Sequence, residues 1–316
     1  MDDLIIIGLG PAALTASIYG SRYQLKNLII GEVLAGELSK ASRIENLPGF
    51  VSIPGLEWGE KVKEQVEKLG AKVVLGRVGR IEKKGKKFTV YTEAGEKYQA
   101  KTLIVATGSE RRKLGIPGEK EYVGRGVSYC TNCDAPFFRD KIVALIGGSD
   151  AAISGAVHTA EYAKKVYIIY RRDKLRAEPI WLEEWEKIEK RGKGETIYNT
   201  NITEILGDGS KVTGVKLDNL YQGKETLVLD GVFIEIGGVP GTSLLKPLGV
   251  NLTETGYVQV NEAMETNIAG LFCAGDMTDK SIVLVQAITA MAQGAIAAAS
   301  AYKYLKGEKA PQILGI

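Results

Sequence analysis

Cysteine and surplus charge are both scarce in this chain, and each scarcity excludes a class of protein. Three cysteines among 316 residues, Cys130, Cys133 and Cys273, are too few for a secreted protein held together by disulfides. The net charge is +3, and the Lys and Arg residues are scattered among Asp and Glu, so no basic field for nucleic acid is present. The sequence therefore predicts a protein of a reducing compartment with no nucleic-acid partner.

Long apolar runs are missing too, apart from residues 281–302, which carry no charge over more than 20 positions. That length is enough to span a bilayer. The segment is mostly alanine and includes glutamine, threonine and serine, so it suits a buried, closely packed helix better than a lipid-facing one. At the N-terminus, the apolar run 4–7 ends at a glycine and is no secretion signal. We expect a cytoplasmic protein without a membrane segment.

Glycine is abundant instead, with 38 residues, and its clearest cluster lies near the N-terminus. The apolar run 4–7 predicts a buried parallel strand that leads into Gly8-Leu9-Gly10-Pro11-Ala12-Ala13. A helix is expected over 12–23 and a second strand over 27–30, followed by Gly31 and Glu32. The order strand, glycine turn, helix, strand and acid is the fingerprint of a dinucleotide-binding unit.

The same layout returns 139 residues later, from Gly8 to Gly147. A strand over 142–146 runs into Gly-Gly-Ser-Asp-Ala-Ala, followed by a helix to about Ala163 and a strand over 166–170. One such pattern is often a plain tight turn, but two in matching context predict two nucleotide sites. Two domains are also what a chain of this length favours.

The order of these pieces predicts an α/β fold with two Rossmann-like dinucleotide-binding domains, the second inserted into the first. The outer domain would comprise residues 1–113 and 240–316, and the inserted domain residues 114–239. Both crossings fall in segments rich in glycine and proline, 115–118 and 237–241, as linkers often do.

The pair Cys130-Thr131-Asn132-Cys133 lies in the predicted inserted domain, just before its glycine turn. A structural zinc site is one alternative, but four ligands are usual and only Cys273 and His158 remain to complete it. Two inert thiols are another. The Cys-x-x-Cys spacing favours a reversible disulfide with a lowered thiol pKa. Because a flavin can accept hydride from a nicotinamide and pass electrons to sulfur, we expect FAD at one site and NAD(P)H at the other.

The two fingerprints differ at one matching position, 24 residues after the first glycine. In the first, Glu32 can accept a hydrogen bond from a ribose 2′-OH, which suits FAD. In the second, Arg171 stands there, with Arg172 and Arg176 after it, and guanidinium groups suit bidentate contact with phosphate. The second site is therefore predicted to prefer NADPH to NADH, the alternative being a solvated basic turn without a ligand.

Six segments in order along nearly the whole chain resemble the low-molecular-weight thioredoxin reductases. They are residues 8–13, 44–49 (Ile-Glu-Asn-Leu-Pro-Gly), 106–108 (Ala-Thr-Gly), 130–134 (Cys-Thr-Asn-Cys-Asp), 171–176 (Arg-Arg-Asp-Lys-Leu-Arg) and 274–276 (Ala-Gly-Asp). The resemblance implies a class II FAD-dependent pyridine nucleotide-disulfide oxidoreductase. Such an enzyme passes electrons from NADPH through FAD and its dithiol to a thioredoxin or a glutaredoxin-like protein disulfide oxidoreductase, and works as a homodimer.

The resemblance also gives roles to residues. Cys133 would face the flavin, Cys130 would attack the partner's disulfide, and Asp134 would supply or take the proton. The only histidine, His158, falls in the second fingerprint helix, so we expect it to be structural. The residues expected to hold FAD are Gly8, Gly10, Pro11, Ala12, Glu32, Gly36, Glu37, Leu38, Asn46, Val78, Ala106, Thr107, Gly108, Gly275, Asp276, Gln286 and Ala287. Those expected to hold NADPH are Gly147, Gly148, Ser149, Asp150, Ala151, Arg171, Arg172 and Arg176.

The chain departs from the family pattern at both nucleotide sites. At the second, Ser149 replaces a usual glycine and Tyr170 a common histidine. At the first, Val285 replaces an arginine before Gln286, and two extra residues lie between Asp276 and Gln286. An enzyme of the same fold with another donor, such as ferredoxin, is therefore the nearest alternative, although the retained arginines argue against it. A non-catalytic flavin redox sensor is another.

Three further expectations concern the inserted domain and the last cysteine. Phe137 and Phe138 follow the dithiol and form either a contact for the partner or part of the core. Cys273, on a buried strand, is a small apolar filler. Because the dithiol and the nicotinamide both need the same flavin, we expect the inserted domain to rotate about hinges at 115–118 and 237–241.

Overall fold

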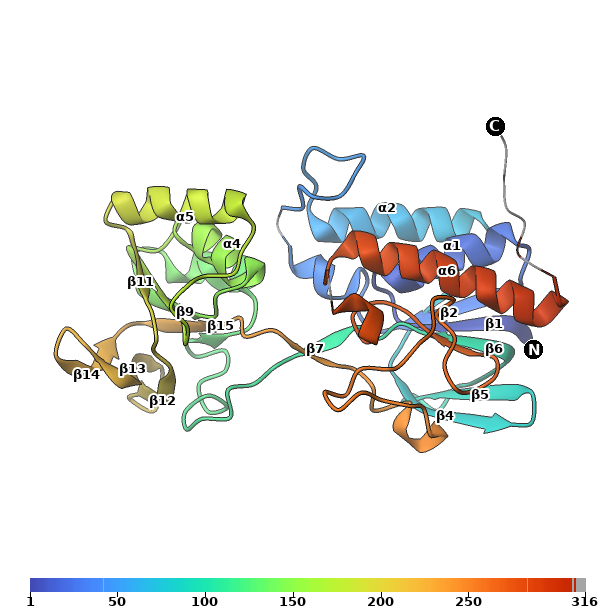
Figure 1. Cartoon of the computed structure of the whole chain (residues 1–316). Helices are drawn as coiled ribbons and strands as arrows, with labels where there is room; N and C mark the ends of the chain where they lie inside the picture. The colour runs from blue at the N-terminus through green and yellow to red at the C-terminus, as the bar shows by residue number, and fades with distance from the viewer. Residues whose placement is uncertain (42, 283, 309, 311–316) are drawn as a thin grey trace. The chain divides into compact units, whose positions relative to one another are not determined.

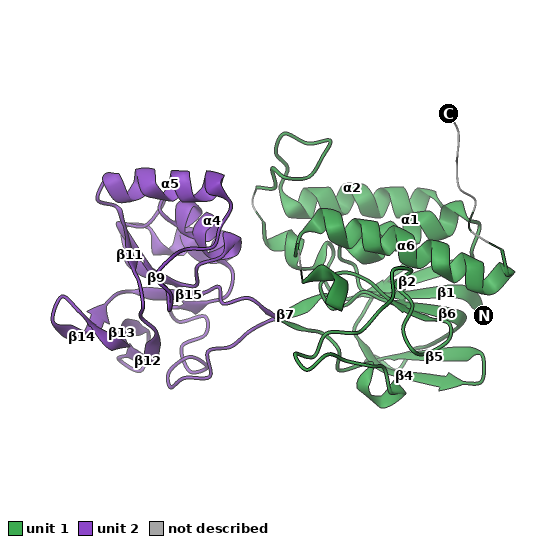
Figure 2. Cartoon of the chain, viewed as in Figure 1, with its two compact units in different colours: residues 1–110, 239–316 green, residues 111–238 purple. Residues whose placement is uncertain are grey.

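A computed structural model describes residues 1–41, 43–282, 284–308 and 310 of the chain. The chain divides into two compact units, shown in Figure 2. Unit 1 comprises Met1–Glu110 and Val239–Ile316, and unit 2 comprises Arg111–Gly238. The chain crosses between them along two short strands that pair with each other, β7 (Ser109–Arg111) and β16 (Gly238–Pro240).

Unit 1 is built on a sheet in the order β3-β2-β1-β6-β5-β4, with β17 paired to β6. β1, β2, β3, β6 and β17 run parallel, whereas β4, β5 and β6 pair antiparallel. The strands are β1 (Asp2–Ile7), β2 (Asn27–Gly31), β3 (Lys72–Leu75), β4 (Val78–Lys84), β5 (Lys87–Thr92), β6 (Lys97–Val105) and β17 (Leu271–Cys273). The run Leu4, Ile5 and Ile6 has no exposed surface, as a central parallel strand requires.

Three helices, α1 (Pro11–Arg22), α2 (Gly55–Lys68) and α6 (Ala287–Lys306), lie on one side of this sheet in Figure 1. A Cβ on Gly294 of α6 would lie 2.1 Å from the carbonyl oxygen of Ala12, so α1 and α6 touch backbone to backbone. This close approach explains why α6 is rich in alanine. Over the described residues, no helix has the length and apolarity to cross a membrane. The described residues also form short 3-10 helices: η1 (Gly36–Lys40), η3 (Lys246–Leu248) and η4 (Asp279–Ser281) in unit 1, and η2 (Ala135–Phe138) in unit 2.

Unit 2 contains a fully parallel sheet in the order β11-β10-β9-β15-β8 and a separate antiparallel sheet, β12-β13-β14. The parallel strands are β8 (Val127–Ser128), β9 (Ile142–Ile146), β10 (Lys165–Ile169), β11 (Gly194–Ile197) and β15 (Gly231–Ile234). The antiparallel strands are β12 (Ile202–Gly207), β13 (Val212–Tyr221) and β14 (Lys224–Val228), and the helices are α3 (Thr131–Asp134), α4 (Asp150–Thr159) and α5 (Pro179–Lys190). Two α/β units, each with parallel strands after its glycine turn and the second inserted into the first, confirm the predicted fold class.

The helix expected to extend to Ala163 is shorter in the structure: α4 ends at Thr159 and turns follow.

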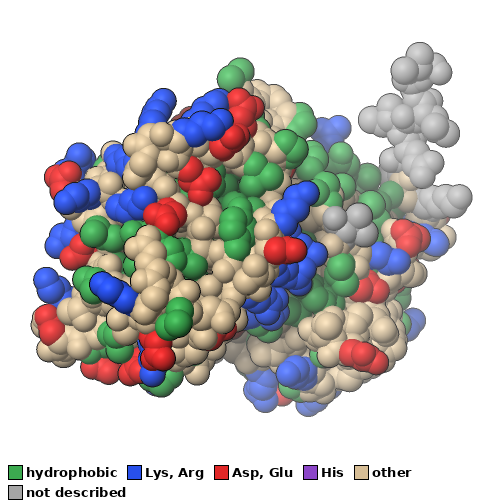
Figure 3. All heavy atoms as spheres, turned by 60° about the vertical axis from the view of Figure 1, so that its left-hand side comes forward, with side chains coloured by type: hydrophobic (Ala, Val, Ile, Leu, Met, Phe, Trp, Pro, Cys, Tyr) green, Lys and Arg blue, Asp and Glu red, His purple; other side chains and the backbone are tan. Residues whose placement is uncertain are grey.

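On the side facing the viewer in Figure 3, lysine and arginine side chains lie among aspartate and glutamate.

Candidate functional site

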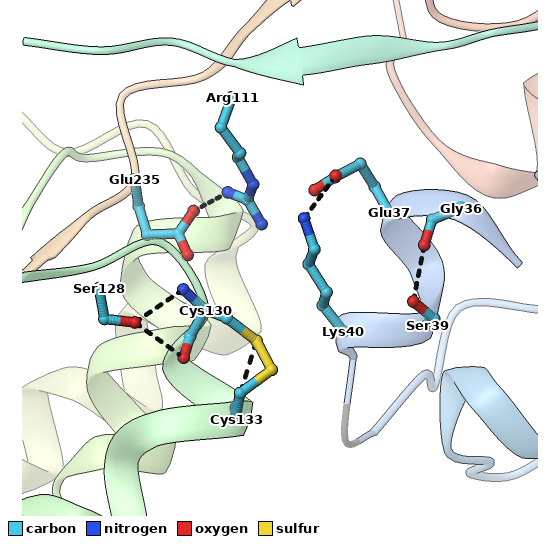
Figure 4. The surroundings of a disulfide bond; sticks show 9 residues. All are labelled: Gly36, Glu37, Ser39, Lys40, Arg111, Ser128, Cys130, Cys133 and Glu235. Atoms are coloured by element: carbon cyan, nitrogen blue, oxygen red, sulfur yellow. Dashed lines mark hydrogen bonds and ion pairs between the residues drawn. A yellow bond between two sulfur atoms is a disulfide. The ribbon is translucent and has the colours of Figure 1, made fainter. Parts of the chain in front are cut away.

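The Cys-x-x-Cys pair is a disulfide at the start of the short helix α3. Cys130 and Cys133 are joined, with their Cα atoms 5.3 Å apart, and Cys133 is exposed while Cys130 is half-buried. The backbone N–H of Cys133 donates to Sγ of Cys130 at 3.2 Å, and the N–H of Cys130 donates to the Ser128 hydroxyl at 3.0 Å (Figure 4). Asp134 ends the helix, and its N–H donates to the Cys130 carbonyl at 3.1 Å.

Helix α3 rests on the fingerprint helix of the same unit. The side chain of Thr131, only 5% exposed, lies against Gly155 of α4, where a Cβ would come within 2.8 Å of it. His158 lies further along α4, its Nδ1 3.8 Å from a carboxylate oxygen of Glu161. The redox pair and the second nucleotide turn are therefore parts of one packed structure.

The first glycine turn follows β1, and its glycines differ in what they require. Gly8 has a φ of +120°, and a Cβ there would lie 2.2 Å from the carbonyl oxygen of Ala106, so packing demands glycine. Gly10 has an ordinary φ of −78°, and a Cβ there would meet no protein atom within 4 Å. Neither strain nor packing explains glycine at this place, which leaves room for a ligand at the start of α1.

Other predicted FAD residues gather around this turn within unit 1. A Cβ on Gly36 would lie 3.3 Å from Cα of Gly10, and one on Gly275 would lie 3.2 Å from Cβ of Ala12. The η1 turn is fixed by Ser39, whose hydroxyl donates to the Gly36 carbonyl at 2.8 Å (Figure 4). The structure thus groups segments far apart in sequence at the carboxyl ends of β1, β6 and β17.

The polar groups of this cluster come from separate loops. Burial raises the pKa of Asp276, and the negative charge of Glu37 raises it further. The Asn46 amide donates to Oε1 of Gln286 at 3.2 Å, and Gln286 caps α6. Glu32 is exposed directly after β2. The remaining predicted residues lie in neighbouring positions: Pro11 starts α1, Leu38 is in η1, buried Val78 starts β4, Thr107 and Gly108 follow β6, and Ala287 starts α6.

The second glycine turn follows β9 in unit 2. Gly147 has a φ of +146°, and a Cβ there would lie 2.2 Å from the carbonyl oxygen of Glu235. Gly148 lies under the ring of Tyr170, which a Cβ would approach to 2.7 Å. Ser149 is exposed and caps α4 with a φ of −98°.

The predicted NADPH residues flank this turn. The N–H of Arg176 donates to the Gly148 carbonyl at 2.6 Å, which brings this arginine's backbone directly to the turn. Arg171 and Arg172 follow the end of β10, and all three arginines are exposed. Asp150 starts α4 and accepts a hydrogen bond from the N–H of Glu178 at 2.6 Å, and Ala151 is exposed beside it.

One residue at this turn was missed by the sequence analysis. Glu235 follows β15 as Ala106 follows β6, and each carbonyl lies against the first glycine of its turn. The Glu235 side chain, only 3% exposed, forms an ion pair with Arg111 (Figure 4). The run 231–237, a buried strand ending in glycine, repeats the pattern of 103–108 and was the available signal.

The two phenylalanines after the dithiol have different surroundings. Phe138 is half-buried, with its ring centroid 5.1 Å from that of Phe233 in an edge contact, and it fills the space beside Gly231. Phe137 is 78% exposed. The structure therefore places Phe138 with the core of unit 2 and leaves Phe137 on the surface.

Comparison with known proteins identifies the family. The family model described as pyridine nucleotide-disulphide oxidoreductase matches residues 2–294. Thioredoxin reductase of Listeria innocua is 42% identical over 306 residues, which cover 96% of this chain and 94% of that protein. The chain belongs to the thioredoxin reductases of the pyridine nucleotide-disulphide oxidoreductase family. The predicted family, enzyme class and redox function are thereby confirmed, and the non-catalytic sensor is excluded.

Solved thioredoxin reductases have the same fold. The Lactococcus lactis enzyme, in the FR conformation, superposes with a TM-score of 0.91 at 37% identity, covering 98% of this chain and 100% of that one. The T. acidophilum enzyme gives a TM-score of 0.88 at 37% identity, covering 96% and 98%. The similarity therefore extends over the sequences of both units.

Proposed function

We propose that this chain passes electrons from NADPH through FAD to the Cys130–Cys133 disulfide, and from the resulting dithiol to a thioredoxin or a glutaredoxin-like protein. The observation that carries the proposal is the disulfide, which shares unit 2 with a dinucleotide turn flanked by arginines. A bound flavin supplies the link between a hydride donor and sulfur. Two electrons and two protons convert the disulfide to two thiols, which pass both on to the disulfide of the partner.

The residues of unit 1 fit FAD. The open space beside Gly10 allows a pyrophosphate to approach the N-terminus of α1, where unpaired N–H groups favour an anion. Glu32 is exposed directly after β2 and is suited to accept a hydrogen bond from a ribose hydroxyl. Asp276 and Gln286 would also hold the cofactor.

The residues of unit 2 fit NADPH. Arg171, Arg172 and Arg176 are exposed after β10, and their guanidinium groups would recognise the 2′-phosphate. Ser149 brings a side chain to the start of α4, where unit 1 has open space. We expect this difference to weaken both nicotinamide cofactors alike and to leave the preference for NADPH.

The geometry of α3 supports Cys130 as the thiol that attacks the partner. Its Sγ already accepts the N–H of Cys133, and the same bond would stabilise a thiolate there after reduction. The Cys130 thiolate would attack one sulfur of the partner's disulfide, and Cys133 would then displace the partner and re-form the internal disulfide. Asp134, at the end of α3, is proposed to exchange the proton.

The surface beside the dithiol offers an apolar contact for that partner. Phe137 is 78% exposed only four residues after Cys133. Exposed aromatic side chains are enriched in protein interfaces. We propose that Phe137, and not Phe138, contacts the partner protein.

Turnover is proposed to require rotation of unit 2, about a hinge that we place closer to the crossing between the units than the predicted segment 115–118. The 115–118 segment is attached to unit 2, because the Pro117 carbonyl accepts the N–H of Ile205 at 3.0 Å and Gly118 packs on the same residue. We therefore place the pivot at β7 and β16. The resemblance also implies a homodimer, which analytical ultracentrifugation would test.

Anaerobic titration of the purified protein, reconstituted with FAD, tests the donor and the dithiol together. NADPH is expected to bleach the flavin and to yield two new thiols, and steady NADPH-driven reduction of thioredoxin should follow. Reduction by reduced ferredoxin but not by NADPH would replace the proposed donor. No reduction by any donor would overturn the pathway.

A further inference from the structure

Glu119 is a buried carboxylate that ties together two segments of unit 2. Glu119 is only 4% exposed. It accepts hydrogen bonds from the N–H of Leu114 at 2.9 Å, from the N–H of Gly115 at 2.6 Å and from the hydroxyl of Tyr129 at 2.7 Å. Burial raises the pKa of Glu119, but these hydrogen bonds lower it by more, so the group is a charged acceptor.

Tyr129 is the residue directly before Cys130. Burial raises its pKa, and the hydrogen bond to Glu119 raises it further, so Tyr129 remains a neutral donor. The Lys113 ammonium lies 3.4 Å from the centroid of its ring, a cation–π contact that holds the ring in place. Tyr129 is thus bound at both its ring and its hydroxyl, by residues of the segment 113–119.

The backbone around Cys130 is fixed on both sides as a result. Before it, Tyr129 is anchored to Glu119; after it, Thr131 is packed against Gly155. Reduction breaks the bond between the sulfurs, and their later separation depends on how far the backbone can relax. A held backbone keeps the two thiols close, which favours re-formation of the disulfide.

We propose that Tyr129, anchored by Glu119, is a positioning residue for the redox pair that sets the stability of the Cys130–Cys133 disulfide. This inference rests on the proposed function of that pair as the redox centre. In the balanced step, two thiols form one S–S bond and give up two electrons and two protons to an added disulfide, which becomes a dithiol. Removing the anchor loosens the reduced form and lowers the equilibrium constant for closing the internal disulfide.

The test is Tyr129→Phe in the full chain, equilibrated with oxidised and reduced dithiothreitol and then alkylated and weighed by mass spectrometry. The change keeps the ring and its contact with Lys113 and removes only the donor. The equilibrium constant for closing the Cys130–Cys133 disulfide is expected to fall about threefold to tenfold. This fall raises the midpoint potential of the pair by about 15 to 30 mV. Dithiothreitol is the only electron donor in this measurement, so neither a nicotinamide nor a protein partner affects it.

Tyr221→Phe is the matched control, because the Tyr221 hydroxyl also donates to a carboxylate of unit 2, that of Glu195. Its potential is expected to equal that of the wild type. An unchanged potential in folded Tyr129→Phe, or an equal shift in both variants, would overturn the proposal. If Tyr129→Phe does not fold, Glu119→Gln takes its place with the same criterion.

The outcome is separable from the proposed electron pathway. If NADPH fails to reduce the protein but Tyr129→Phe shifts the potential, the donor is wrong and the positioning role stands. If the wild-type disulfide cannot be reduced and re-formed reversibly, the proposed function of the pair fails first.

Discussion

The glycine turns of units 1 and 2 share one layout. In each, the turn packs closely against the end of the second strand, but the glycine that permits this contact lies at a different position. In unit 1, the residue 23 positions after the first glycine is Gly31, where a Cβ would lie 2.7 Å from Cγ of Leu9. In unit 2, the residue at that offset is Tyr170, and its ring requires glycine at position 148 of the turn instead. Gly31 and Gly148 are therefore both explained by a close contact that leaves no space for a side chain.

The positions that differ without a packing reason are those predicted to face a ligand. Gly8 and Gly147 are equivalent, since each would put a Cβ 2.2 Å from the carbonyl oxygen of the residue after a parallel strand. Gly10, by contrast, has open space beside it, whereas its counterpart in unit 2 is Ser149. Packing therefore requires glycine at Gly8 and Gly147, whereas at Gly10 we predict that glycine leaves room for the cofactor.

The largest expected effect concerns the dithiol, which only unit 2 carries. Cys130→Ser and Cys133→Ser should each abolish thioredoxin reduction, because neither variant can form the disulfide. With FAD bound, Cys130→Ser should keep a long-wavelength absorbance from the Cys133 thiolate beside the flavin, and Cys133→Ser should lack it. Visible spectra of both variants with oxidised FAD decide; the reverse pattern would exchange the two roles. Cys273→Ser, a buried thiol whose pKa burial raises, is the control and should retain activity.

The second effect tests the contrast between Glu32 and Arg171. Replacing both Arg171 and Arg172 by Ala removes two exposed guanidinium groups, each expected to contribute about 1.5 to 3 kcal/mol of charge-assisted hydrogen bonding to the 2′-phosphate. The kcat/KM for NADPH should fall by one to several orders of magnitude, whereas that for NADH should barely change. Lys174→Ala, exposed in the same turn, is the control. A wild type that uses NADH as well as NADPH would contradict the prediction.

The sequence predicted the parts of the fold that depend on local patterns. The strand expected at 142–146 is β9 without change, and those expected at 27–30 and 166–170 are β2 and β10 with one-residue differences at their ends. These runs are apolar and rich in β-branched residues, and two of them end at a glycine, Gly31 and Gly147, so propensity and burial agree. The helix predicted to extend to Ala163 was too long, since α4 ends at Thr159 and Ala160 is its C-cap.

Pairs of side chains distant in sequence could not be predicted in the same way. Arg111 and Glu235 are 124 positions apart, and the pattern of 231–237 that contains Glu235 does not indicate its ion pair with Arg111. Glu119 and Tyr129 are only ten apart, but their bond depends on a loop conformation that no periodicity indicates. The orientation of Phe137 and Phe138 was equally open, because two adjacent aromatic residues look alike in sequence and only packing against Phe233 distinguishes them.

A smaller effect is expected where those two phenylalanines differ. Phe137→Ala should raise the KM for thioredoxin about tenfold, since an exposed aromatic contact typically contributes roughly 1 to 2 kcal/mol to binding. Its reduction of DTNB, a small artificial disulfide, should be unchanged. Phe138→Ala leaves a cavity beside Phe233 and should lower the free energy of unfolding and both activities together. Equal losses of both activities in Phe137→Ala would contradict the docking contact.

The smallest effect returns to the two turns and compares Gly148→Ala with Gly10→Ala. At Gly148 the new methyl group would meet the Tyr170 ring at 2.7 Å, so we expect the free energy of unfolding of the apoprotein to fall by about 1 to 3 kcal/mol through overpacking. At Gly10 the methyl group meets no protein atom within 4 Å, and the apoprotein should keep its stability to within about 0.5 kcal/mol. Gly10→Ala should weaken FAD binding more than Gly148→Ala does, because the space beside Gly10 is the one proposed for the cofactor. Urea denaturation without FAD and fluorescence titration with FAD measure the two quantities separately. If Gly10→Ala binds FAD as tightly as the wild type, the open space beside Gly10 does not face the cofactor and the proposed difference between the turns is wrong.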